Sequence, residues 1–438
     1  MKHLILIVVA MLFISHLHAL ERSFEQRMVK RIDTTEVMNY LHDGGDPNKC
    51  IILRNSYASS IKLRPLNLAA QENDGFLAQL ALENGAAIDH RDTLNDTALS
   101  IAAGKGHVPM VKLLIKHGAS VNVTDSKDEY TLALKEAIDN NQSDIVKLLV
   151  EHGVTVNALT PGAFCPLHLA CWKGSYEIVK HLLDKGAGMN YNTKRSQRPL
   201  TVAIDRGYTA IAIELIKRGA EVEYEITHEP NVLLTPLELA CCKDREIVKA
   251  LIARKVNVNI VNKYKNRTPL HITIDAPIVS FLIQAGANVN AQDKEGKVPL
   301  HDHVDMGRLE IVKILLANKA DANIKDVNGN MPLYNAAIST CIGLPGDRYA
   351  IMDLLFNAGA KVEFGDFEQE ELLTGNVRDA KVTIKLLNKG LIPSDRFITK
   401  LNLRICQEAA NKECEWNKEI YKQRLSDLQA IKQLCEKK

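Results

Sequence analysis

The sequence lacks an excess of charge of either sign. Its 438 residues include 55 lysines and arginines against 53 aspartates and glutamates, which leaves a formal net charge of +2. It also has no long basic run with interleaved aromatic residues, the pattern that binding to a nucleic acid backbone requires. The composition therefore predicts no nucleic acid partner.

Recognisable catalytic motifs are lacking as well. The chain contains neither a Gly-x-Ser-x-Gly nucleophile motif nor a Walker-type phosphate loop. No local signature places a cysteine and a histidine together as a nucleophilic pair. We therefore expect no catalytic residue and no small-molecule cofactor in the chain.

Cysteine is present without an organised spacing. Nine cysteines are an odd number, so at least one thiol has no partner within the chain, and no disulfide framework is predicted. Cys171 and Cys241 each follow an alanine in an apolar segment, where a cysteine acts as a small buried hydrophobe. A compartment with weak oxidising pressure, or passage into a reducing host cytosol, agrees with this usage.

Long hydrophobic runs are lacking except at the N-terminus. A short basic start precedes an uninterrupted apolar run from Leu4 to Ile14, and Leu17-His18-Ala19 resembles a signal-peptidase site. Residues 1–19 are therefore predicted to be a signal peptide, and the mature chain a secreted or periplasmic protein. The alternative is an uncleaved membrane anchor, although the run is shorter than the roughly 20 apolar residues that a membrane span needs.

What the chain does have is an internal repeat. Leucines in a Thr-Pro-Leu-His-like context recur with spacings of 33, 35, 33, 33, 37, 33, 30 and 33 residues. These anchors, which define repeats 1 to 9, are Leu66, Leu99, Leu134, Leu167, Leu200, Leu237, Leu270, Leu300 and Leu333. A period near 33 indicates a β-turn followed by two antiparallel helices, stacked into a solenoid.

Repeat 4 preserves the pattern best. It begins Pro166-Leu167-His168-Leu169-Ala170, where proline suits the first helical position, and Gly174 ends the first helix. Ile178, Val179, Leu182 and Leu183 then form the apolar stripe of a second helix, which Gly186 closes. This unit resembles the ankyrin repeat, and the resemblance extends over roughly residues 33 to 363.

The resemblance implies an all-α ankyrin-repeat solenoid of about nine to eleven helix-turn-helix units with β-hairpin tips. We expect an N-terminal capping region at 20–62, ankyrin repeats at 63–363, a degenerate repeat at 364–393 and a C-terminal helical tail at 394–438. The tail is predicted to fold back as a cap, with a coiled-coil or partner-binding tail as the alternative. In the family the motif histidine is a structural hydrogen-bonder, so His301, with Asp302, His303 and Asp305 nearby, is not predicted to bind a metal.

Some repeats depart from the pattern. Repeat 7 is short, so its helix pair is expected to be shortened near Asp275-Ala276-Pro277. Repeat 9 is long, and its excess residues, Ser339 to Asp347, are expected to loop out between its two helices. Lys255 and Lys319 replace the closing glycine of repeats 6 and 8, which predicts local strain or a different helix end.

Ankyrin repeats often bind partners through variable positions near the end of the first helix, which face a concave groove, and through the hairpin tips. In this register four of the nine residues that lie five after an anchor leucine are aspartates. We hypothesise a carboxylate stripe with an exposed aromatic anchor; the alternative is that the aspartates cap their own turns. The groove residues are Asp139, Trp172, Asp205, Asp275 and Asp305, with Arg206 and Lys243 as partly neutralising neighbours.

The hairpin tips alternate in sign. Acidic tips carry Asp89, Asp92 and Asp96, or Glu221, Glu223, Glu225 and Glu229; basic tips carry Lys194, Arg195 and Arg198, or Lys263, Lys265 and Arg267. The basic residues predicted to contact a partner are Lys194, Arg195, Lys263 and Lys265. Alternation suits a protein partner with mixed charges, and solvated turns alone also account for it.

The sequence thus predicts a non-catalytic scaffold that binds a protein partner of unknown identity. Ankyrin proteins with a signal peptide resemble those of host-associated bacteria, some of which act as effectors on host proteins, so the resemblance includes a host-directed role. The alternatives are an enzyme with a small unit in residues 365–438 and a membrane-tethered adaptor. About seventy residues leave little room for an enzyme.

Overall fold

The fold is known from a computed structural model. It divides into two compact units, Met1–Ala203 and Ile204–Lys438, and each is treated by itself. The structure describes residues 34–54, 60–92, 94–124, 132–158, 165–192, 197–229, 232–263, 265–338, 345–365, 369, 372, 380–410 and 418–437. The predicted signal peptide therefore lies outside the described residues.

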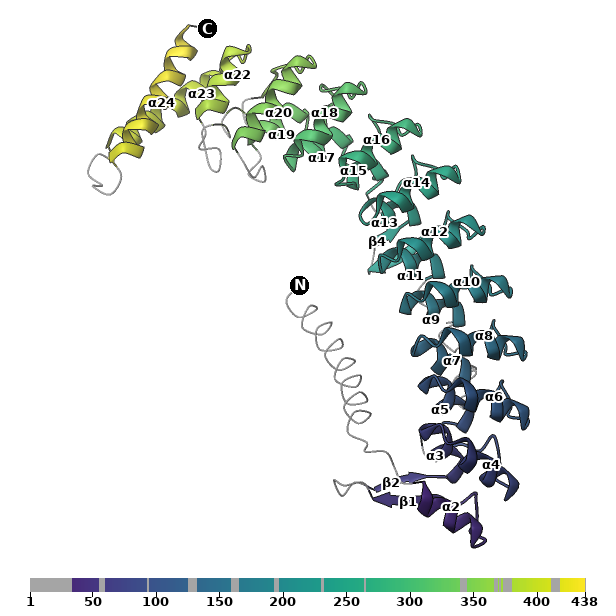
Figure 1. The fold of residues 1–438 in the computed structure, drawn as a ribbon. Coiled ribbons are helices and arrows are strands. Elements are labelled where there is room, and N and C mark those ends of the chain that lie inside the picture. The colour runs from purple at the N-terminus through teal and green to yellow at the C-terminus, as the bar shows by residue number, and fades with distance from the viewer. Residues whose placement is uncertain are drawn as a thin grey trace. The chain divides into compact units, whose positions relative to one another are not determined.

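The first unit is a series of short antiparallel helix pairs that follow a single helix and a hairpin (Figure 1). Its elements are α2 (Thr35–His42), β1 (Ile51–Arg54), β2 (Ser60–Leu63), α3 (Pro65–Glu72), α4 (Gly75–Glu83), α5 (Ala98–Lys105), α6 (Val108–Lys116), α7 (Leu132–Asp139), α8 (Ser143–Glu151), α9 (Pro166–Lys173) and α10 (Tyr176–Asp184). Each first helix contacts the first helix of the next repeat, as α5 does with α7 and α7 with α9.

The second unit continues the same pattern and ends in three further helices. Its elements are α12 (Thr209–Lys217), β3 (Ile226–Glu229), β4 (Val232–Leu234), α13 (Pro236–Cys241), α14 (Arg245–Ala253), α15 (Pro269–Ile272), α16 (Ala276–Gln284), α17 (Pro299–Asp305), α18 (Leu309–Ala317), α19 (Pro332–Ile338), α20 (Pro345–Asn357), α22 (Ala380–Asn388), α23 (Asp395–Ala410) and α24 (Lys418–Glu436). The boundary between the units falls within α11 (Pro199–Asp205). The predicted helical solenoid is confirmed.

Hairpin tips are less regular than the sequence predicted. In the described residues only β1 with β2 and β3 with β4 form antiparallel strand pairs. Other tips are turns in which an aspartate accepts backbone N–H groups, as Asp92 does from Leu94 and Asp96. Such side-chain turns need no strand ladder.

The first helices begin at a recurring cap. In repeats 7 and 6, for example, Thr268 and Thr235 are N-cap residues that precede a proline. The Glu238 carboxylate accepts the Thr235 N–H at 2.8 Å, and His271 Nδ1 accepts the Thr268 N–H at 3.1 Å. A satisfied cap is worth about 1 kcal/mol, so the motif fixes where each helix begins.

The second helices bury one face. In α10 the side chains of Ile178, Val179 and Leu182 are fully buried. Cys171 and Cys241 are buried too, as predicted, and burial raises the pKa of both thiols. The described cysteines Cys50, Cys165, Cys171, Cys241, Cys242 and Cys435 are free thiols.

Near the end of many repeats an asparagine side chain forms hydrogen bonds to the backbone of the next repeat. Asn157, for example, donates from Nδ2 to Gly186 O at 3.1 Å and accepts the Gly188 N–H on Oδ1 at 2.8 Å. The same pair of bonds is made by Asn48, Asn122, Asn259, Asn290 and Asn323. Asn48 makes it from the segment after α2, so that segment is joined to the array like a repeat.

The departures from the repeat pattern have clear structural outcomes. Repeat 7 is shortened as expected, because α15 has only four residues. Lys255 and Lys319 adopt the left-handed backbone that glycine has at this position in other repeats, with φ of 58° and 67°. Lysine resists this conformation, so the backbone is strained there. Of the insertion in repeat 9, residues 339–344 lie outside the described residues. Pro345 to Asp347 were expected to loop out, but they form the first turn of α20.

The C-terminal helices pack on one another. α24 contacts both α22 and α23; that these helices cap the array stays a prediction. Phe397 and Leu401 of α23 and Ile431 of α24 are buried. Trp416 lies outside the described residues. None of the described helices is both long enough and apolar enough to cross a membrane.

Candidate functional site

The predicted groove residues lie at or just after the first helices. Asp139 and Asp305 are the last residues of α7 and α17, and Trp172 is in the last turn of α9. Trp172 is 47% exposed, unusually open for a large aromatic side chain. Nearly half of its surface is therefore open to solvent.

Asp275 does not share this register. α15 ends at Ile272, so Asp275 is the N-cap residue of the second helix, α16. The expectation that Asp275 lies near the end of a first helix is therefore wrong. A shortened first helix moves the fifth residue after the anchor out of that helix.

Asp139 and Asp205 are paired with cations. Asp139 lies 2.9 Å from Lys173 Nζ of the next repeat and 3.1 Å from Lys135 Nζ. Asp205 lies 3.4 Å from Lys243 Nζ, which also donates to its backbone carbonyl. The carboxylates therefore join neighbouring repeats, and much of the negative charge predicted for the groove is neutralised.

Asp275, at the start of α16, is also paired with a cation of a neighbouring repeat. Its Oδ2 accepts from Arg245 Nε at 2.6 Å, and this bond raises the pKa of Arg245. Asp275 makes no side-chain hydrogen bond to the start of α16, whereas Asp244 does cap α14 by accepting from Glu246 and Ile247. Turn capping therefore does not explain Asp275, and pairing between repeats does.

The charged hairpin tips also pair with one another. Lys263 Nζ lies 2.6 Å from Glu225 Oε1, and Lys265 Nζ lies 4.0 Å from Glu295 Oε1. Lys194 and Arg195 lie outside the described residues. Because the charge alternates in sign along the sequence, neighbouring tips attract one another. Each such ion pair stabilises the fold by about 0.2–1 kcal/mol.

One cysteine–histidine pair escaped the sequence reasoning. Cys165 Sγ lies 3.1 Å from His168 Nδ1 at the start of α9, a geometry that activates nucleophilic thiols elsewhere. Here the thiol is fully buried, and burial raises its pKa. Thr268 Oγ1 makes the equivalent contact to His271 Nδ1 at 2.8 Å, so Cys165 replaces a capping threonine. The signal was a cysteine at the threonine position of the repeat motif.

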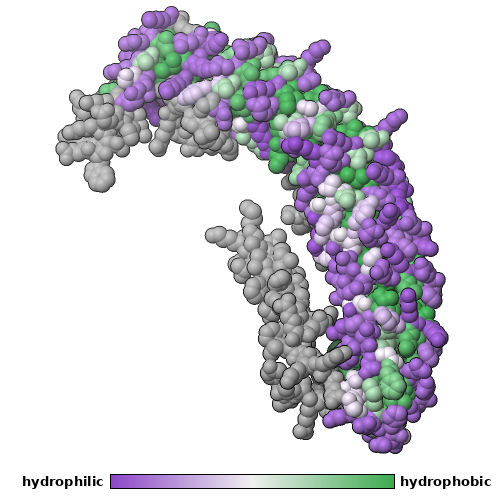
Figure 2. Space-filling view, in the orientation of Figure 1, coloured by the Kyte–Doolittle hydropathy of each residue, from purple (hydrophilic) through white to green (hydrophobic). Residues whose placement is uncertain are grey.

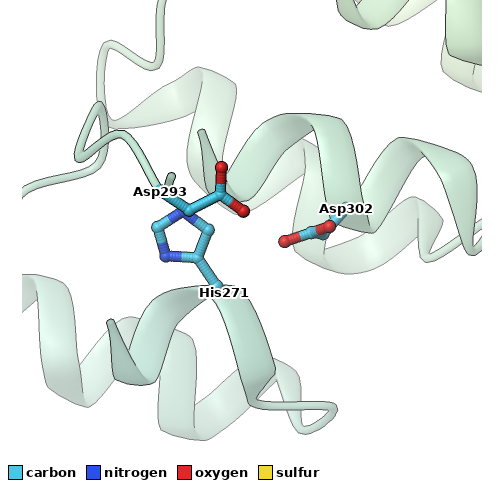
Figure 3. A group of neighbouring side chains, drawn as sticks. All are labelled: His271, Asp293 and Asp302. Carbon is cyan, nitrogen blue, oxygen red and sulfur yellow. The ribbon is translucent and has the colours of Figure 1, made fainter. Parts of the chain in front are cut away.

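Figure 3 shows a group with the residue types of a metal site. His271 of α15, Asp302 of α17 and Asp293 of the turn before α17 are buried, and their ligand atoms lie within 4.8 Å of one another. However, Arg267 donates to Asp302 Oδ1 at 2.7 Å and lies 3.4 Å from Asp293 Oδ2. A guanidinium therefore already supplies the positive charge.

The nitrogens of His271 are engaged as well. Nδ1 accepts the Thr268 N–H, and Nε2 lies 3.2 Å from Lys297 O, to which it donates. Burial lowers the pKa of His271 and raises that of Asp302 to about 6, while Arg267 opposes the shift in Asp302. The group is best described as a polar junction between repeats 7 and 8.

His301 and His303 have structural partners too. His301 Nδ1 accepts the Val298 N–H at 3.2 Å, and its Nε2 lies 3.1 Å from Asn330 O, as expected for the motif histidine. His303 Nε2 donates to Leu270 O at 2.8 Å. Burial lowers the pKa of His303 to about 4, so the ring is neutral at pH 7.

The surface drawn in Figure 2 is mainly hydrophilic, with hydrophobic areas between. The exposed large hydrophobic residues among the described ones are Phe76, Leu94, Trp172, Val261, Ile274, Met306, Val327, Ile392 and Leu403. Scattered apolar residues of this kind are common on soluble domains. Trp172 stands out by its size and by its position at the end of a first helix.

Comparison with known proteins identifies the family. The family model described as "Ankyrin repeats (3 copies)" matches residues 66–160, 162–228, 222–293, 237–326 and 273–366, which together are well over half of the chain. The chain therefore belongs to the ankyrin-repeat family. Ankyrin repeats indicate a scaffold for protein–protein interaction, and protein partners are the class they suggest.

The chain is similar to parts of several characterised proteins. It is 33% identical over 140 residues to the probable 26S proteasome regulatory subunit p28 of Saccharomyces cerevisiae, covering 30% of this chain and 61% of that protein. It is 42% identical over 71 residues to the human 2-5A-dependent ribonuclease, covering 16% of this chain and 10% of that protein. It is 28% identical over 96 residues to mouse ankyrin repeat domain-containing protein 37, covering 21% and 60%.

These matches cover less than two thirds of each relative. The ribonuclease match spans only a tenth of that enzyme, so its named activity does not transfer with the repeats. What the relatives have in common with this chain is the repeat itself.

Proposed function

We propose that the chain is an exported scaffold that binds a protein partner through the groove-side ends of its first helices, with Trp172 as the main anchor. The observation that carries the proposal is the 47% exposure of Trp172 beside a neutralised ion pair. Large aromatic side chains dominate binding energy where they enter a partner's pocket.

Paired groove charges give the scaffold specificity more than affinity. Asp139, Asp205 and Asp275 are already held by lysine or arginine, so a partner gains little by pairing with them. These ion pairs hold the lysine and arginine side chains in place within each of the two units. A preorganised surface loses little conformational entropy on binding, which suits a repeat array.

The experiment is affinity capture with the tagged mature chain, residues 20–438, from extracts of native and candidate host cells. Captured proteins are identified by mass spectrometry, and the affinity of the main partner is then measured. We expect Trp172→Ala to weaken binding at least tenfold, because a central aromatic anchor contributes about 2 kcal/mol or more. Asp205→Ala is expected to weaken it less than about fivefold.

Phe76→Ala is the matched control, because Phe76 is a 65% exposed aromatic on a second helix, α4. Its removal should leave binding unchanged. Full affinity in Trp172→Ala, with circular dichroism showing an intact fold, would remove the groove proposal.

Export is supported by the apolar run Leu4–Ile14 and the Leu17-His18-Ala19 site. Mass spectrometry of the N-terminus from native cells tests it: a chain beginning at Leu20 supports export with cleavage. A chain that keeps Met1 and needs detergent for extraction supports the membrane-tethered adaptor. A host-directed effector role requires in addition that the captured partner be a host protein.

A further inference from the structure

The second unit contains a pocket away from the groove residues. It has a volume of about 440 Å³, within the range of about 300–1,000 Å³ typical of small-ligand sites. It is lined by Lys325, by the turn that leads into α19 and Tyr334 of that helix, by residues 362–365 after α20 with Gln369, and by residues 390–392 after α22. It therefore lies where the last repeat meets the C-terminal helices.

The floor of the pocket is apolar. Met331 and Leu391 are each 1% exposed and Tyr334 is 6% exposed. The rings of Tyr334 and Phe364 pack edge to face with centroids 5.9 Å apart. Such a floor favours an aromatic or branched aliphatic group.

The walls are fixed before any ligand arrives. The buried Gln369 donates from Nε2 to Phe364 O at 3.0 Å and to Ile392 O at 3.1 Å, and its Oε1 accepts the Ser394 N–H at 2.8 Å. One side chain thus joins the residues after α20 to those after α22. A preformed pocket avoids the entropy cost of ordering its walls.

Lys325 and Glu363 line the rim, and Lys361 next to the rim adds a second positive charge. Lys325 Nζ lies 3.4 Å from Glu363 Oε2, and Lys361 Nζ lies 3.8 Å from Glu363 Oε1. Two ammonium groups therefore share one carboxylate, and all three side chains are about half exposed or more. A second carboxylate, supplied by a ligand, completes the pairing. Ile392, 77% exposed, adds an apolar edge to the same rim.

We propose that this pocket binds a carboxylate attached to one aromatic or branched aliphatic group. The apolar group packs on Tyr334, Met331 and Leu391, and the carboxylate pairs with Lys325 at the rim, with Lys361 next to it. Either a free organic acid or the C-terminal residue of a polypeptide supplies this chemistry. The site is separate from the groove, so it stands whether or not Trp172 binds a partner.

The test measures binding of defined probes to residues 20–438 by titration calorimetry or ligand-observed NMR. The probes are 3-phenylpropionate and its neutral amide, and the peptide Gly-Ser-Gly-Phe with a free or an amidated C-terminus. We expect the acids to bind with Kd of about 1 mM or tighter, and each amide to bind at least threefold more weakly than its acid.

Two variants locate the site. Lys325→Ala is expected to weaken acid binding about threefold, within the range of an exposed ion pair, and to narrow the difference between acid and amide. Ile392→Ala is expected to weaken the acid and the amide alike, because it removes apolar contact only. The matched controls, Lys313→Ala and Leu94→Ala, change an exposed paired lysine and an 81% exposed leucine elsewhere, and both should bind like the wild type.

The outcomes separate the two sources of the ligand. A free-acid peptide that binds at least fivefold more tightly than 3-phenylpropionate assigns the pocket to polypeptide C-termini, whereas equal or weaker binding assigns it to small acids. The proposal is overturned by equal binding of acid and amide, by no saturable binding up to about 10 mM, or by wild-type affinity in both Lys325→Ala and Ile392→Ala.

Discussion

Repeats 4 and 7 share a Pro-Leu-His start but end their first helices differently. α9 of repeat 4 ends at Gly174, whose φ of 75° lets its own N–H reach back to the carbonyls of Ala170 and Cys171. α15 of repeat 7 stops after Ile272, and the carbonyls of Leu270 and Thr273 accept hydrogen bonds from His303 and Arg308 of repeat 8. One helix end is satisfied locally and the other by a neighbour.

The comparison shows how a repeat array tolerates a shortened unit. A buried carbonyl without a partner costs about 1–3 kcal/mol, so truncation needs donors from elsewhere. Repeat 8 supplies a buried histidine and an arginine at positions where repeat 4 has Ala170 and Ser175. Hydrogen bonds from repeat 8 therefore replace those that the shortened helix of repeat 7 cannot make.

Removal of the histidine that repeat 8 donates to repeat 7 should have the largest effect on stability. His303→Leu leaves Leu270 O unpaired in the core, and we expect a loss of about 2–3 kcal/mol in the free energy of unfolding. Urea unfolding measures it. His152→Leu, which changes an exposed histidine that bonds Leu148 O, is the control and should cost less than about 0.5 kcal/mol. An equal cost for both variants would show that the carbonyl of α15 needs no partner.

Acid should weaken repeats 4 and 8 through their buried histidines. Burial lowers the pKa of His168 in repeat 4 and of His303 in repeat 8 from 6.5 to about 4. Below pH 6.5 the unfolded chain therefore binds more protons than the folded one, and stability falls until about pH 4, by on the order of 2–3 kcal/mol for each histidine.

Three carboxyls act in the opposite direction. Burial raises the pKa of Asp96 and Asp302 to about 6 and also raises that of Glu238, so these groups stabilise the folded state as pH falls from 6 toward 4. His181, His271 and His301 also have lowered pKa values, and five histidines should outweigh three carboxyls. Melting temperatures recorded from pH 7 to 4.5 should decline, and less steeply in His168→Gln. The same slope in that variant would mean that His168 is not a buried neutral base.

The smallest effect should come from the closing residues. Repeat 4 closes with Gly186 at a φ of 81°, and repeat 8 with Lys319 at 67°. Lys319→Gly should stabilise the protein by about 0.5–1 kcal/mol, because lysine resists left-handed backbone, and Gly186→Lys should destabilise it by a similar amount. Thermal unfolding of the two variants measures both changes. A stability change of the same sign in the two variants would show that backbone strain is not the cause.

Local features were predictable from the sequence. Helix starts follow from the Pro-Leu-His motif, the burial of Cys171 and Cys241 from their position after a small residue, and the short α15 from the missing residues near Asp275. Each of these depends on residues close together in the chain. The same holds for the left-handed helix ends at Lys255 and Lys319.

Pairing between repeats could not be predicted. Lys173 with Asp139, Arg245 with Asp275 and His303 with Leu270 O join residues about 30 or more positions apart. The sequence placed aspartates in the groove but not the cations that neutralise them. Asp275 was assigned to the wrong element because a fixed count from the anchor ignores helix length.

The most direct test of the account is photo-crosslinking in the mature chain. A photoreactive amino acid replaces Arg206, an exposed residue predicted to face the groove, or Lys180, exposed on the second helix α10. We expect the captured partner to crosslink from position 206 and not from 180. Crosslinking from 180 alone, or equally from both, would contradict binding through the groove.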